Sequence, residues 1–143
     1  MNPTSEYLQS ARTGDLDRIK ELLEGPAKLI SNIEVADAEG KNALLLAAEH
    51  NRRKVFKYML QQQIDINCKD NHGRTALHYA CKAGDRNFVL YLLLLGADWG
   101  MPDNNRNAPG TGDAEMLSFI GDVSSSMSEP DYRRVCLLWQ TRP

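Results

Sequence analysis

The apolar positions of this chain recur in short helical blocks separated by polar turns. Within residues 86–95, Val89, Leu92 and Leu93 lie at i, i+3 and i+4, the spacing that places side chains on one face of a helix. A polar turn at residues 70–73 and a shorter block of mostly small apolar residues come before this helix. The pattern therefore predicts a unit made of a turn followed by two short helices.

The same pattern recurs when the chain is aligned with itself at an offset of 33 residues. The matching pairs are Asp37 and Asp70, Gly40 and Gly73, Leu44 and Leu77, Ala47 and Ala80, Val55 and Phe88, Leu60 and Leu93, Asp65 and Asp98, and Asn67 and Gly100. A repeat of this length indicates a stack of small units, because one such unit cannot bury its apolar face alone.

The fuller of these units resembles an ankyrin repeat. The residues that carry the resemblance are Asp70, Gly73, Arg74-Thr75-Ala76-Leu77-His78, Ala80, Gly84-Asp85, Val89, Leu92-Leu93 and Gly96-Ala97-Asp98. The resemblance implies an all-α ankyrin-repeat solenoid, in which helix-turn-helix repeats carry β-turn tips. It also implies that His78 hydrogen-bonds the turn backbone and that Cys81 fills a small buried position.

We expect residues 1–143 to form a single domain of about three repeats plus a degenerate fourth. The predicted units are an N-terminal capping repeat at 4–36, repeats at 37–69 and 70–102, a degenerate repeat at 103–125 and a C-terminal helix at 128–141. The first unit is longer than one period by 4 residues, which predicts an insertion within 25–36. In the second unit, Asn42, Leu45 and Asn51 replace a threonine, a histidine and a glycine, and we expect its turns to be held less firmly.

The fourth unit departs most from the pattern. Gly110-Thr111-Gly112 stands where its first helix should lie, so that residues 112–120 would keep only the second helix. The C-terminal segment then places Tyr132, Val135, Cys136 and Trp139 on one helix face, which predicts a cap for the open end of the stack.

The amino-acid composition indicates the cellular compartment and the kind of partner to expect. Three cysteines form an odd, sparse set typical of a reducing compartment, so we expect a cytoplasmic or nuclear protein. Residues 1–6 lack a basic region followed by an apolar one, and the longest nearly continuous apolar run, 88–95, is far shorter than a bilayer span, so we expect neither export nor membrane insertion. Residues 40–90 carry 9 basic and 4 acidic side chains, against 4 and 8 before them and 4 and 7 after them. This basic middle favours an acidic partner surface and is too weak for nucleic acid.

No motif indicates catalysis or a cofactor. Cys68, His72, His78 and Cys81 have the residue types of a zinc site, but they serve distinct repeat positions and are not expected to converge on a metal ion. Gly110-Thr111-Gly112 lacks the preceding strand and following lysine of a phosphate-binding loop. We therefore expect a non-enzymatic protein without a metal, cofactor or small-molecule substrate.

The resemblance implies a protein partner bound in the concave groove, by the turn tips and the exposed face of the first helices. The candidates are the residues that occupy these positions in the two repeats, together with the aromatic residues Tyr79 and Trp99. They are Ala38, Glu39, Lys41, Glu49, His50, Lys69, Asn71, His72, Arg74, Tyr79, Lys82, Ala83 and Trp99. Four cations among them, including Lys41 and Arg74, predict a basic groove. The alternative is a structural subunit permanently embedded in a larger assembly.

Overall fold

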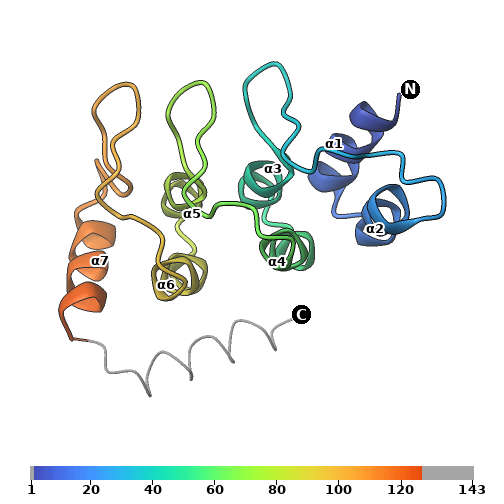
Figure 1. The fold of residues 1–143 in the computed structure, drawn as a ribbon. Coiled ribbons are helices and arrows are strands. Elements are labelled where there is room, and N and C mark those ends of the chain that lie inside the picture. Colours follow the sequence, from blue (N-terminus) through green and yellow to red (C-terminus); the bar gives the residue numbers. More distant parts are fainter. Residues whose placement is uncertain (1, 127–143) are drawn as a thin grey trace.

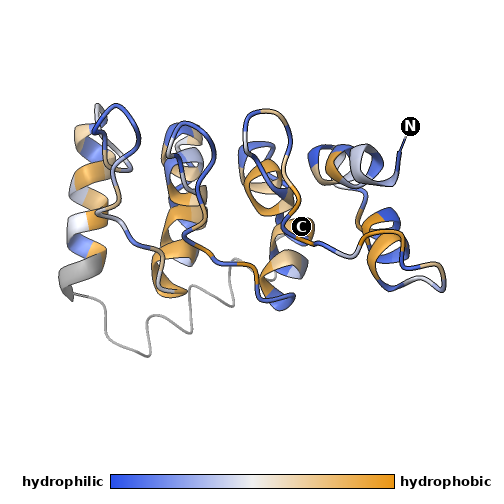
Figure 2. Ribbon diagram, turned by 45° about the horizontal axis from the view of Figure 1, so that its top comes forward, coloured by the Kyte–Doolittle hydropathy of each residue, from blue (hydrophilic) through white to orange (hydrophobic). Residues whose placement is uncertain are grey.

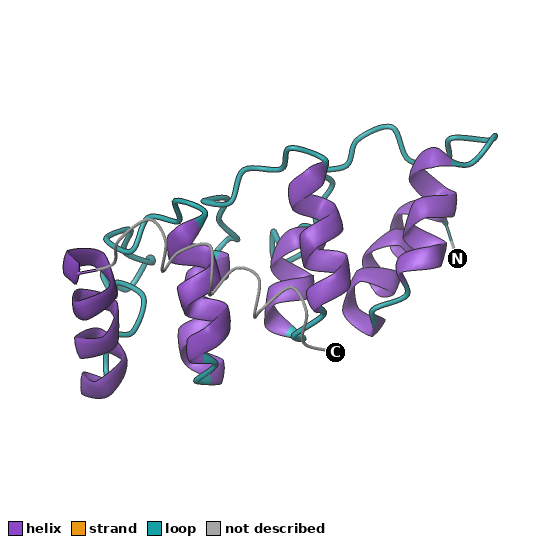
Figure 3. Ribbon diagram, turned by 90° about the horizontal axis from the view of Figure 1, so that it is seen from below, coloured by secondary structure: helices purple, strands orange, loops and turns teal. Residues whose placement is uncertain are grey.

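The computed structural model describes residues 2–126, which form seven helices and no strand. The helices are α1 (Pro3–Thr13), α2 (Leu16–Glu24), α3 (Ala43–Glu49), α4 (Arg53–Gln61), α5 (Ala76–Ala83), α6 (Arg86–Leu94) and α7 (Ala114–Ser126), shown in Figure 3. The predicted all-α ankyrin solenoid is confirmed. The C-terminal helix predicted at 128–141 lies outside the described residues.

The helices form two layers, and three turns project from the same side of the stack (Figure 1). The first helices α1, α3 and α5 make an inner layer in which α3 packs against both of its neighbours. The second helices α2, α4 and α6 each pack on the inner helix of their own unit, and α7 packs on α6. Figure 2 shows hydrophobic residues concentrated in the helices and hydrophilic residues in the projecting turns.

A single core runs through the stacked units. Leu44 and Leu77 of the inner layer and Phe56 and Leu92 of the outer layer are almost completely buried. The rings of Phe56 and Phe88 meet edge to face with their centroids 5.0 Å apart, which joins the second unit to the third. None of the helices within residues 2–126 has both the length and the apolar character needed to cross a bilayer.

The second unit keeps its helix ends despite its two asparagines. The Asn42 side chain accepts a hydrogen bond of 3.0 Å from the Leu45 backbone N–H and so caps α3. Asn51 takes a φ of 57°, in the left-handed region that Gly84 occupies at the same place in the next unit. The two asparagines therefore keep the helix ends, because asparagine both caps helices and tolerates this conformation. Leu45, in contrast, cannot make the two bonds to turn backbone that His78 makes in the next unit.

The insertion of the first unit is a loop that folds back onto its own helices. Ile30 in this loop is buried, and the Ile33 carbonyl oxygen accepts a 2.9 Å hydrogen bond from the Tyr7 hydroxyl. The loop thus closes one end of the core.

The fourth unit lacks its inner helix, as the sequence predicts. Residues 104–113 form turns in place of a helix, with Gly110 and Gly112 at φ values of 83° and 91°. Helix α7 follows directly, capped by Asp113, whose carboxylate accepts from the Met116 N–H at 3.1 Å. The inner layer therefore ends at α5.

Candidate partner-binding surface

An aspartate holds the base of each projecting turn. One carboxylate oxygen of Asp70 accepts hydrogen bonds from the backbone N–H groups of His72 and Arg74, at 2.9 and 3.0 Å. Asp37 and Asp103 make the same pair of bonds one period earlier and one period later. The backbone hydrogen bonds from the 103–107 turn lower the pKa of Asp103, because they favour its charged form.

The tips of successive turns are hydrogen-bonded to one another. The Asn71 backbone N–H donates to the Glu39 carbonyl oxygen at 2.9 Å, and its side-chain amide donates to the Ala38 carbonyl oxygen at 3.1 Å. Asn104 repeats both bonds with the Asn71 and His72 carbonyl oxygens, at 2.8 and 2.9 Å. We call these four bonds the tip ladder. Because of them, the three turns are ordered before any partner arrives.

The tip ladder gives Asn71 a structural role that the repeat pattern does not reveal. This residue was expected to contact a partner, and its side-chain amide donates instead to the Ala38 carbonyl oxygen. The available signal was the recurrence of asparagine at 71 and 104, one period apart. Asn71 nevertheless remains exposed at the tip of its turn.

Lys41 forms ion pairs with two carboxylates inside the groove. Its ammonium nitrogen lies 2.7 Å from a Glu39 carboxylate oxygen and 3.0 Å from one of Glu49, and only 11% of its side chain is exposed. It also lies 5.6 Å from the centroid of the Tyr79 ring, a cation–π distance. Burial lowers the pKa of Lys41, but the hydrogen bonds to Glu39 and Glu49 outweigh it and raise the pKa above its ordinary value.

Tyr79 supports the groove from beneath. It is only 5% exposed, and its hydroxyl donates a hydrogen bond to the second carboxylate oxygen of Asp70. Burial, and then this bond to an anion, raise the pKa of Tyr79. Both Lys41 and Tyr79 were expected to face a partner, and the structure places them below the surface, because each pairs with carboxylates of its own unit.

The balance of charge along the groove changes from one unit to the next. In the second unit, one lysine is shared by the two carboxylates of Glu39 and Glu49. Lys69, at the junction of the second and third units, and Arg74 and Lys82 of the third unit form no ion pair with any residue in the described part of the chain. The basic groove expected from sequence thus has its unpaired cations from Lys69 onward, in and next to the third unit.

Most other candidate residues lie at the surface. Ala38, Glu39, Glu49, His50, Lys69, Asn71, His72, Lys82, Ala83 and Trp99 are exposed, and Arg74 is half-buried. Trp99 is 52% exposed. Its place after α6 puts it on the loop that leads to the fourth turn.

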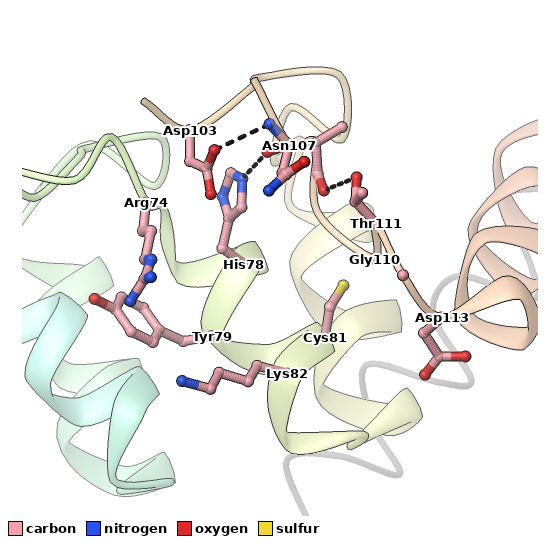
Figure 4. A pocket seen from close by; sticks show the side chains of 12 residues that line it. Arg74, His78, Tyr79, Cys81, Lys82, Asp103, Asn107, Gly110, Thr111 and Asp113 are labelled. Atoms are coloured by element: carbon pink, nitrogen blue, oxygen red, sulfur yellow. Dashed lines mark hydrogen bonds between the residues drawn. The ribbon is translucent and has the colours of Figure 1, made fainter. Parts of the chain in front are cut away.

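A hollow of about 380 Å³ opens beside α5, where the inner layer ends. Figure 4 shows Arg74, Tyr79 and Lys82 along one side of it and Gly110, Thr111 and Asp113 along the other. The repeat pattern predicts the missing helix but not this hollow, because it does not say whether the core closes over the gap.

His78 joins the third unit to the fourth at the edge of the hollow. Its Nδ1 accepts from the Thr75 backbone N–H at 3.1 Å, so its Nε2 carries the proton and donates to the Asn107 carbonyl oxygen at 3.0 Å (Figure 4). The contact with turn backbone implied by the family resemblance is present. Both ring nitrogens are occupied.

The described residues hold no cluster of three or more histidine, cysteine or acidic side chains that could bind a metal ion. The zinc candidates have other contacts: the Cys68 sulfur accepts a hydrogen bond from the Asn42 amide at 3.3 Å. Burial raises the pKa of the Cys81 thiol to about 12, which keeps it protonated near neutral pH. Neither cysteine has the environment of a nucleophile.

Comparison with known proteins identifies the fold family. A sequence model of ankyrin repeats in three copies matches residues 8–103. An ankyrin repeat protein of Acanthamoeba polyphaga mimivirus is 43% identical over 55 residues, which are 38% of this chain and 8% of that protein. A palmitoyltransferase of Lachancea kluyveri is 31% identical over 100 residues, 69% of this chain but 13% of that protein.

A third relative matches along most of its length. Protein phosphatase 1 regulatory subunit 27 of Homo sapiens is 28% identical over 134 residues, 94% of this chain and 75% of that protein. The chain thus spans a small part of the first two relatives and three quarters of the third. With the family model matching more than half of its residues, the chain belongs to the ankyrin-repeat family.

Proposed function

We propose that this chain is a non-catalytic module that binds a protein partner through its inner helices and turn tips. Ankyrin repeats generally mediate protein–protein interaction and are typically non-catalytic. The observation that carries the proposal is the tip ladder, in which four hydrogen bonds order three turns beside an exposed surface. A surface ordered in advance loses little conformational entropy when a partner binds.

The partner should present acidic or polar side chains to the third unit. Lys69 and Lys82 are exposed and Arg74 is half-buried, and none of the three forms an ion pair within residues 2–126. Complementary charge speeds association and selects partners more than it adds affinity. In the second unit, Lys41 is already paired with the carboxylates of Glu39 and Glu49, so this unit attracts an acidic partner less strongly.

Affinity capture with charge-reversed variants tests this assignment. The tagged full chain is compared with the double variant Lys69→Glu and Lys82→Glu, and bound proteins are identified by mass spectrometry. A matched control reverses Lys28 and Lys54, which are exposed outside this surface, and so changes the net charge equally. A partner lost with the first variant and retained with the control supports the surface. A partner that both variants retain refutes it.

A second candidate function is a permanent or regulatory subunit of a larger assembly. It is favoured by the similarity to protein phosphatase 1 regulatory subunit 27 along 94% of this chain. Three repeats are also close to the smallest number that is stable alone. Size-exclusion chromatography and thermal melting of the isolated chain distinguish the two: a folded monomer contradicts obligate assembly. Co-purification with a phosphatase catalytic subunit, at a fixed ratio, would support it.

A further inference from the structure

The outer side of α6 is apolar although it faces away from the core. Residues 88–95 form an unbroken run of apolar side chains, so leucines occupy both sides of this helix. Leu90 lies about 200° round the helix axis from the fully buried Leu92, because each residue turns the helix by about 100°. Leu94 follows Leu90 by one turn and shares its side. A helix that is apolar all round is normally covered on every side, so a covering element is expected here.

Burial around the outer side of α6 extends beyond the main core. Leu90 of α6 and Val123 of α7 are each 7% exposed, yet neither belongs to the core cluster that joins the stacked units. Leu94 is half-buried, and Leu95 is 43% exposed. A hollow of about 490 Å³, which we call the outer hollow, is lined by Lys57, Leu60, Gln61, Tyr91 and Leu95. Partly covered leucines beside this hollow leave room for a further apolar contact.

We propose that the C-terminal segment of this chain, residues 127–143, docks along the outer side of α6 and reaches the outer hollow. Its residues Tyr132, Val135, Cys136 and Trp139 have the spacing of one helix face. That face covers the outer leucines of α6 and places Trp139 at the outer hollow. The inference goes beyond the proposed partner-binding function, because the inner helices and the turn tips stay available to a partner.

The sequence alone favours the open end of the stack for this segment, but α7 offers little apolar surface there. Met116 and Ile120 of α7 are buried in the core. The opposite side of α7 carries small or polar residues that are all exposed, namely Ala114, Ser118, Gly121 and Asp122. An apolar helix face placed there would gain little hydrophobic free energy, because that gain comes from apolar area buried on both surfaces. The leucines of α6 are the better match.

The described part of the chain ends at a point from which the segment can reach this position. Arg86 at the start of α6 pairs with Glu115 at the start of α7, 3.3 Å apart, and the two helices pack side by side (Figure 3). They therefore run in the same direction, so Ser126 ends α7 near the end of α6. A helix over 128–141 would be about 21 Å long, whereas packed neighbouring helices lie about 10 Å apart. The segment is thus long enough to cross α6 and reach α4.

The direct connection to α7 favours the segment of the same chain over that of a second copy. Docking of a tethered segment is intramolecular, and a short tether gives it a millimolar effective concentration. A second copy would compete only when the protein itself approaches that concentration. Docking within one chain is therefore independent of protein concentration.

Hydrogen–deuterium exchange of the full chain, measured on peptides from residues 127–143, tests the position. Two leucines form a matched pair of variants: Leu95 at the outer hollow is 43% exposed, and Leu117 on α7 is 45% exposed. Leu95→Asp should raise the exchange rate of the segment about tenfold, because a buried carboxylate disfavours the docked state. Leu117→Asp should change that rate less than about twofold. Thermal melting verifies that both variants fold.

A second measurement needs no substitution. In the nuclear magnetic resonance spectrum of the full chain, the indole protons of Trp139 should show nuclear Overhauser contacts to the methyl groups of Leu95 and Leu60. These contacts should persist on tenfold dilution of the protein, as intramolecular docking requires.

Four results would overturn the proposal. They are exchange of the segment at the rate of a free peptide of the same sequence, a larger effect of Leu117→Asp than of Leu95→Asp, indole contacts to Ser118 and Asp122 instead of Leu95, or protection that disappears on dilution. The last result would assign the segment to a second copy of the chain. The proposed function is decided separately, because affinity capture with the Lys69 and Lys82 variants reports on the groove and not on the outer side of α6.

Discussion

Replacing Gly40 by alanine is expected to break the first step of the tip ladder. Gly40 has a φ of 79°, and a Cβ atom on it would lie 2.3 Å from the Asn71 side-chain oxygen and 2.8 Å from the Asn71 backbone nitrogen. The side-chain oxygen could turn away, but the backbone nitrogen is held by its bond to the Glu39 carbonyl oxygen. The two turn tips must therefore separate.

The magnitude follows from the contacts that are lost. Holding alanine in the left-handed region costs about 1 kcal/mol. Separating the tips removes the two hydrogen bonds from Asn71 to Glu39 and Ala38, each worth about 1 kcal/mol. The sum is a decrease of about 3 kcal/mol in the free energy of unfolding, a large part of the total for a domain of this size.

Gly84 provides a matched control, because it has a similar φ of 72° but a Cβ atom on it would meet no other atom within 4 Å. Gly84→Ala should cost only the backbone strain, about 1 kcal/mol. Urea unfolding of both variants, followed by far-ultraviolet circular dichroism, measures the difference. If Gly40→Ala is no more destabilising than Gly84→Ala, the tip ladder does not stabilise the stack and the reasoning is refuted.

Two further substitutions test other parts of the stack. Tyr79→Phe removes the hydroxyl that binds Asp70 and should cost about 1–2 kcal/mol near neutral pH. Folding raises the pKa of Tyr79, so this tyrosine stabilises the fold fully below its ordinary pKa of 10.0, and the stabilisation is lost as pH rises through the folded pKa. In urea titrations, the variant should therefore differ less in stability from the unsubstituted protein at alkaline pH. Arg52→Asp supplies the side-chain cap that α4 lacks and that Asp85 gives α6, and should raise stability by about 1 kcal/mol. An unchanged or lower melting temperature would show that the Arg52 bond to the Arg12 carbonyl oxygen, 2.8 Å long, outweighs the cap.

Much of the fold could be predicted because a repeat array is built from local contacts. Each unit packs mainly on the next one, so the spacing of Val89, Leu92 and Leu93 already specifies which helix face is buried. The absence of a helix over Gly110-Thr111-Gly112 followed from the same local logic, since two glycines in a three-residue segment disfavour helix.

The polar residues of the surface were harder to assign. The repeat pattern places Lys41, Asn71 and Tyr79 in the groove. In the structure Asn71 bonds the turn of the preceding unit, Tyr79 bonds Asp70 of its own turn, and Lys41 pairs with two carboxylates of its own unit. A one-dimensional repeat pattern identifies a position without saying which polar atom lies within hydrogen-bond distance of it. The same limit made the replacement of threonine by Asn42 look like a loss, although its side chain caps α3.

The sequence by itself thus determined the period, the two helices of each unit and the place where the inner layer ends. These features depend on the order of apolar, small and turn-forming residues, which acts over short distances along the chain. Only the tertiary structure decided which polar groups are already paired and that a hollow remains open beside α5. Pairing and closure depend on distances between atoms of different helices and turns, and those distances exist only once the chain is folded and the units are stacked.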